Sequence, residues 1–171
     1  TFVYFQLLDE DEMMVQSMRS GTVLQSGEHT RCTGCHDERR TAPAWLGNQL
    51  PLAMQRPPSR LEGWYGPPRQ FSFMSEVQPV FDKQCVTCHD YGQKAGKKLN
   101  LAPDRLIAFN TAYTELWRGG YFRCAGGGPA EIQSAYSWSS HASPLAREIR
   151  QPTIPEHRDI RLTHEELHRV I

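Results

Sequence analysis

The first 30 residues show the short apolar runs and turn residues that are typical of β structure. Residues 2–8 carry apolar side chains into an acidic run at residues 9–12, and residues 13–18 return as a second apolar run. This pattern predicts a β-hairpin with an acidic tip. Ser20-Gly21 and Ser26-Gly27 mark further turns.

From residue 71 onward, the apolar positions follow a helical period. Phe73, Val77, Val80 and Phe81 have the spacing of one apolar helix face, and Pro79 is expected to shorten or kink that helix. Further helices are expected over residues 102–117, after the Ser143-Pro144 start, and after Thr163, whose spacing to Glu166 is that of a capping box.

Residues 41–70, between these two patterns, are rich in proline and glycine, which excludes long helices and central strands there. We therefore divide the chain into a β-rich module of residues 1–70 and a helical module of residues 71–171. The expected fold class is mainly α with a β-rich N-terminal segment.

Four of the five cysteines lie in two copies of one motif, CxxCH, at residues 32–36 and 85–89. CxxCH is the attachment site of a c-type haem: both thiols bond to the haem, and the adjacent His binds the iron. Two copies predict two covalent haems, and each module then carries one of them. The expected ligands are Cys32, Cys35 and His36 for haem one, and Cys85, Cys88 and His89 for haem two.

Zinc and redox chemistry are the alternatives to haem. Paired CxxC motifs also bind structural zinc, but 49 residues separate Cys35 from Cys85, whereas zinc ribbons have about 15–20. Zinc also gives no reason for a His after each pair, so we do not expect a zinc site. A two-residue gap suits a redox-active disulfide better than a structural one.

The sixth ligand of haem two is expected to be a histidine. Small cytochromes c usually use a Met before their last helix, but all five methionines precede the second motif. His157 is the first choice, because it lies in a proline-bracketed loop six residues before the capping box, and His141 is the second. His164 and His168 are expected to face solvent. Two His ligands lower a haem potential relative to His and Met.

Haem one has no clear sixth ligand. Met18, Met54 and His29 are candidates, and an open iron position is the alternative, which permits binding of small molecules. Cys124 is the cysteine outside both motifs, and we expect it to be a buried free thiol.

Composition narrows the function classes. The chain has 19 basic and 19 acidic residues, which gives no argument for binding nucleic acid or an anionic membrane surface. Its mean hydropathy is −0.58, and no apolar run approaches the ~18 residues of a membrane span. Haem attachment to CxxCH follows export, so a periplasmic or otherwise extracytoplasmic location is expected. Its ends suggest a piece of a longer protein.

Several segments together resemble the middle domain of the hydrazine synthase alpha subunit and its relatives. The segments that carry the resemblance are residues 15–20, 27–28, 32–39 and 41–43 in the first half, and 77–82, 109–116, 129–133, 137–138, 140–143, 157–162 and 165–166 in the second. The resemblance covers nearly the whole chain. It implies the C-terminal two-haem part of a larger protein with an N-terminal β-propeller, and a second haem with two His ligands that passes electrons.

One departure from that family bears on activity. The resemblance implies a catalytic first haem whose iron is bound by a Tyr shortly after the motif, while the motif's His turns to zinc. Here residues 37–40 are Asp, Glu, Arg and Arg, and the next Tyr is Tyr65. We therefore expect His36 to bind iron in the ordinary way and a relative rather than a true hydrazine synthase.

Three functions follow from this reading. The first is a dihaem cytochrome that transfers electrons to redox partner proteins. The second is an enzyme whose first haem is open and reactive, with Arg39, Arg40 and His29 as polar groups near it. The third is a subunit of a larger assembly, in which the haems form one link of an electron path.

Overall fold

The computed structural model describes residues 2–29, 55–58, 60, 62–125 and 133–171. The first CxxCH motif, residues 32–36, lies outside these residues. The chain forms two compact units: residues 1–3 with 22–69, and residues 4–21 with 70–171. The second unit thus joins an N-terminal segment to the predicted helical module. The predicted module boundary at residue 70 stays a prediction.

Both units contain a small antiparallel sheet. In the first unit, β1 (Phe2–Val3) pairs with β4 (Thr22–Val23). In the second unit, β2 (Gln6–Leu8) pairs with β3 (Met14–Ser17), which confirms the predicted hairpin. The Asp9 carboxylate closes its acidic tip by accepting hydrogen bonds from the backbone N–H groups of Asp11 (3.0 Å) and Met13 (2.9 Å).

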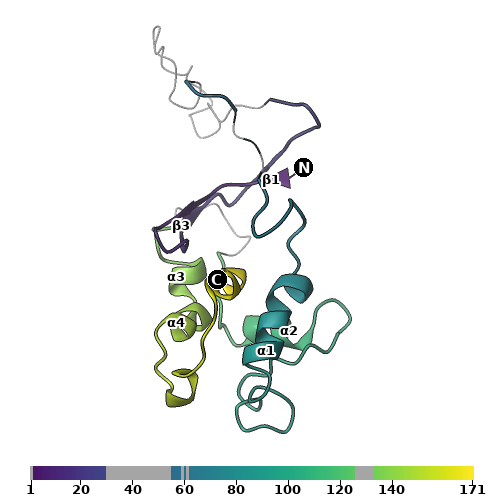
Figure 1. The fold of residues 1–171 in the computed structure, drawn as a ribbon, viewed down its shortest axis with the longest axis vertical. Coiled ribbons are helices and arrows are strands. Elements are labelled where there is room, and N and C mark those ends of the chain that lie inside the picture. Colours follow the sequence, from purple (N-terminus) through teal and green to yellow (C-terminus); the bar gives the residue numbers. More distant parts are fainter. Residues whose placement is uncertain (1, 30–54, 59, 61, 126–132) are drawn as a thin grey trace. The chain divides into compact units, whose positions relative to one another are not determined.

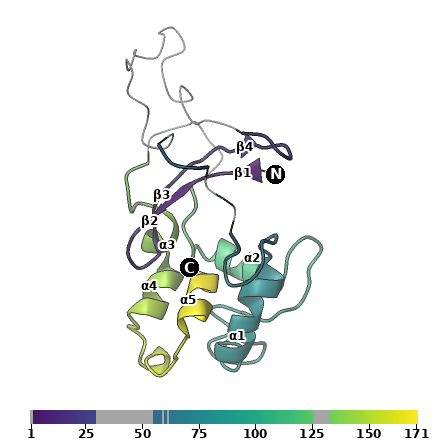
Figure 2. The same cartoon turned by 45° about the horizontal axis from the view of Figure 1, so that its top comes forward.

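The second unit also contains several short helices (Figure 1). They are η2 (Phe73–Val77), α1 (Gln78–Gln84), α2 (Thr111–Arg118), α3 (Ser139–Ala142), α4 (Pro144–Arg150), η3 (Pro155–His157) and α5 (His164–Val170). In two views α5 lies between the α3–α4 pair and the α1–α2 pair (Figures 1 and 2). Among the described residues, no helix is long and apolar enough to cross a bilayer.

The apolar face predicted before the second motif builds the core. Val77 and Phe81 pack with Leu101, Ala112 and Leu116, all buried. The first turn of this segment is the π-helical η2, and the regular α-helix begins at Gln78, next to Pro79. Proline has no N–H to donate and favours the first turn of an α-helix, so α1 starts beside it.

Helix α2 is shorter than expected, because it starts at Thr111 and not near residue 102. The Asn110 side chain caps it by accepting from the Tyr113 N–H (3.0 Å). The same side chain donates to buried Gln78 Oε1 (2.6 Å), which fixes the cap against α1. This long-range contact goes with a helix start at Thr111, whereas the local sequence pattern predicts a start near residue 102.

Two predicted helix starts are confirmed. Thr163 and Glu166 form both hydrogen bonds of the capping box at α5. Helix α4 begins at Pro144 after Ser143, but the Ser143 hydroxyl does not cap it. That hydroxyl donates to the Ser139 carbonyl (2.7 Å) and accepts from the Arg123 N–H (2.9 Å), so it joins α3 to the preceding segment.

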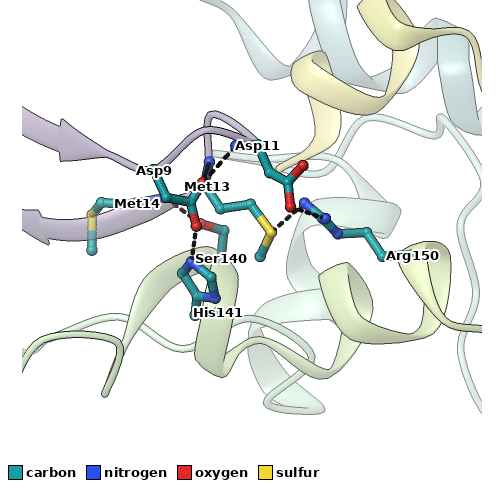
Figure 3. Close-up of polar contacts among 7 residues, drawn as sticks. All are labelled: Asp9, Asp11, Met13, Met14, Ser140, His141 and Arg150. Atoms are coloured by element: carbon teal, nitrogen blue, oxygen red, sulfur yellow. Dashed lines mark hydrogen bonds and ion pairs between the residues drawn. The ribbon is translucent and has the colours of Figure 1, made fainter.

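The hairpin docks onto the helices through its acidic tip (Figure 3). Asp9 Oδ2 lies 2.7 Å from His141 Nε2 on α3, and Arg150 on α4 donates to Asp11 Oδ2 (2.5 Å). The Met14 N–H donates to the buried Ser140 hydroxyl (2.9 Å). These contacts explain why residues 4–21 belong to the same compact unit as helices far away in sequence.

Candidate functional site

The second CxxCH motif lies directly after α1, in a continuation of its turns. The N–H of Cys85 donates to the Phe81 carbonyl (2.8 Å), and those of Cys88 (3.1 Å) and His89 (2.9 Å) donate to the Cys85 carbonyl. Cys85 is half-buried against the core, whereas Cys88 is exposed. The backbone turn therefore keeps both sulfurs and the imidazole on neighbouring positions of one element.

Cys85 is a thiol at neutral pH. Burial, with a further contribution from nearby Cys88, raises the pKa of Cys85 to about 11. Burial against the core therefore favours the neutral thiol of Cys85 over its thiolate.

The ring of His89 is held by its own loop. Its Nδ1 lies 2.9 Å from the Leu99 carbonyl oxygen, which can only accept, so Nδ1 carries the proton. The lone pair is then on Nε2, the nitrogen free to bind a metal. A backbone carbonyl on the second ring nitrogen is the usual way in which proteins orient a histidine ligand.

His157 shows the same arrangement with a different acceptor. It ends η3, and its Nδ1 lies 3.0 Å from Glu148 Oε1 on α4. An ionised carboxylate only accepts, so Nδ1 carries a proton, and in the neutral ring Nε2 has the lone pair. Both side chains are about one quarter exposed.

The structure brings His89 and His157 together. Their ring centroids are 5.9 Å apart, with the ring planes inclined by 35°. Two imidazoles on opposite sides of one metal ion have ring centres about 6 Å apart. Two metal–nitrogen bonds of about 2 Å each lie between the centres, together with part of each ring. The separation of the rings, with Nδ1 engaged on each, therefore suits His89 and His157 as residues that would hold one iron between them.

Glu148 is a site residue that sequence reasoning missed. Its carboxylate accepts from the Thr153 N–H (3.0 Å) and hydroxyl (2.6 Å) and from the Ile154 N–H (2.9 Å). Burial alone would raise its pKa, but these bonds and the bond from His157 lower the pKa of Glu148 to about 2. A single Glu nine residues before a His carries no recognisable sequence signal, so only the folded loop reveals it.

The other predicted histidines lie elsewhere. His141 uses Nε2 for Asp9, and His168 Nδ1 pairs with Glu12 Oε2 (2.9 Å). The expectation that His168 faces solvent is wrong, because its side chain is only 4% exposed in contact with the hairpin tip. The expectation that Cys124 is buried is also wrong, because this thiol is exposed.

The ligands predicted for haem one, Cys32, Cys35 and His36, lie outside the described residues, as does the candidate Met54. Of the other candidates, Met18 is half-buried and His29 exposed. Within the described ranges, no group of three or more His, Cys, Asp or Glu side chains is arranged to hold a metal ion.

Comparison with known proteins gives one match. A family model described as the hydrazine synthase alpha subunit middle domain matches residues 1–37, a stretch that includes the first CxxCH motif. It covers 37 of the 171 residues, so the likeness is to one segment of the chain. No curated protein and no solved structure matches.

Proposed function

We propose that this chain is a dihaem c-type cytochrome that transfers electrons, as part of a larger protein or complex outside the cytoplasm. The observation that carries the proposal is the pair His89 and His157, whose rings lie 5.9 Å apart with Nδ1 engaged on each. Haem supplies a one-electron Fe(III)/Fe(II) couple.

The residues of the second unit have distinct roles in this proposal. Cys85 and Cys88 hold the haem covalently, and His89 and His157 bind its iron. The core around Phe81 and Leu116 fixes the motif at the end of α1. His89 and His157 would together occupy the iron positions that a substrate could bind, and the haem would supply one-electron redox chemistry there, so haem two is suited to electron transfer. His36 with Cys32 and Cys35 is the corresponding set for haem one.

Expression with a c-type haem maturation system tests the proposal. The wild-type protein should retain two haems after denaturation in acid and organic solvent, which only covalent attachment allows. A Cys85→Ala/Cys88→Ala double variant should retain one. Cys124→Ala is the matched control and should retain two. A wild-type protein without covalent haem, or one loaded with zinc, would refute the proposal.

A second function is supported by the family-model match. Its name refers to an enzyme subunit, and the matched residues 1–37 include the first motif but not the second. In this alternative, haem one has an open iron position that reacts with a small molecule, and haem two supplies electrons. Carbon monoxide should then change the spectrum of half of the reduced haem. If carbon monoxide causes no spectral change, only the electron-transfer function remains supported.

A further inference from the structure

We propose that Glu148 is a positioning residue for haem two: its carboxylate holds the His157 ring by Nδ1 and makes that ring the more electron-donating of the two axial ligands. This inference rests on the proposed function. The role is assigned by the 3.0 Å contact between Glu148 Oε1 and His157 Nδ1.

Glu148 is itself fixed in place. One of its oxygens accepts from the backbone N–H groups of Thr153 and Ile154, and the other accepts from the Thr153 hydroxyl. These donors belong to the loop between α4 and η3, and this loop leads directly into η3, which ends at His157. The carboxylate therefore sets the loop conformation and the ring orientation together, so His157 reaches the site already oriented.

The two axial histidines differ in the charge of their acceptors. His89 donates to the neutral Leu99 carbonyl, whereas His157 donates to a carboxylate. A charged acceptor draws the Nδ1 proton more strongly and raises the basicity of Nε2. A more basic ligand stabilises Fe(III) more than Fe(II), so Glu148 lowers the reduction potential of haem two.

The test is a potentiometric titration of the haem-loaded protein with Glu148→Gln, in which the side chain keeps its shape and loses its charge. The potential of haem two should rise by the equivalent of about a tenfold change in the Fe(III)/Fe(II) equilibrium, or about 59 mV for one electron. Electron paramagnetic resonance should still show a six-coordinate, low-spin iron.

Glu156→Gln is the matched control. Glu156 is exposed, precedes His157 directly and forms no described bond to its ring, so the same charge is lost without loss of an acceptor. This variant should shift the potential by less than one third as much. Equal shifts in both variants, or no shift in Glu148→Gln, would overturn the inference.

Thr153→Val keeps the test decisive if Glu148→Gln does not fold. It preserves the carboxylate and removes one bond that fixes it, so a smaller rise in potential is expected, and an unchanged potential would overturn the inference. Failure of the proposed function is distinguishable, because the wild-type protein would then contain no covalent haem at all.

Discussion

Among the histidine–carboxylate pairs of the second unit, those of His157 and His141 use different ring nitrogens. In the loop after α4, His157 donates to Glu148 through Nδ1 and lies beside His89. At the hairpin tip, His141 uses Nε2 for Asp9, and its ring meets the edge of Tyr136. The first arrangement leaves free the nitrogen that haem ligands use. The second joins two segments of chain. The bonded nitrogen alone does not decide the role, because His168 also bonds through Nδ1, to Glu12, and joins α5 to the hairpin. His157 differs from His168 in lying beside the His of the second motif.

The largest expected effect separates these two pairs directly. In the haem-loaded protein, His157→Ala should remove an axial ligand and convert haem two to a high-spin or water-bound iron. His141→Ala should leave its spectrum low-spin, because that side chain already binds Asp9. Electron paramagnetic resonance of the ferric protein measures both. The reverse result would make His141 the ligand and break the comparison.

The next effect concerns the buried His168 of α5, which contacts Glu12 of the hairpin tip. Glu12→Ala removes the carboxylate that faces His168, a side chain with 4% exposure, and should lower the free energy of unfolding by about 1–2 kcal/mol. Urea denaturation followed by circular dichroism measures it. Glu10→Ala, an exposed position in the same tip, should change stability by less than about 0.5 kcal/mol. Equal losses of stability in the two variants would mean that the net charge of the tip, and not the contact between Glu12 and His168, stabilises the fold.

The smallest effect is the acid sensitivity of the Asp9 contact. Burial acts to raise its pKa, but bonds from the Met13 N–H and from His141 hold the pKa of Asp9 below its ordinary value of 3.8. The unfolded chain therefore takes up the proton first, so this stabilisation is present above pH 3.8 and is lost as pH falls below it.

Asp9→Asn tests this pH dependence. Its loss of stability relative to wild type should be present above pH 3.8 and should shrink as the pH falls below that value. Glu10→Gln removes one charge from the same tip without a bond to His141 and controls for net charge. A constant difference between Asp9→Asn and wild type would contradict the assignment.

Sequence reasoning succeeded for features whose partners are close in sequence. The capping box joins residues three apart, and the hairpin tip closes within residues 9–13. The helix before the second motif follows from a repeating apolar face. The start of α2 was misplaced, because the bond from Asn110 to Gln78 spans 32 residues and has no local signature.

The candidate site likewise combines features that the sequence predicts with features that depend on tertiary packing. The CxxCH motifs and the absence of any Met after the second motif point to haem and to a histidine as sixth ligand, and both stay predictions. The approach of His157 to His89, 68 residues apart, depends on how α4 and its following loop pack. The role of Glu148 and the burial of His168 depend on the same packing.

The amino-acid sequence by itself determined the hairpin, the helix before the second motif and the capped start of α5, because these depend on spacing and bonds over a few residues. It also predicts which cysteines attach a haem. Only the tertiary structure decided which histidines meet, which nitrogen of each ring is left free, and which carboxylate holds it. Those properties arise from contacts between distant segments, and hydrophobic packing rather than local spacing brings such segments together.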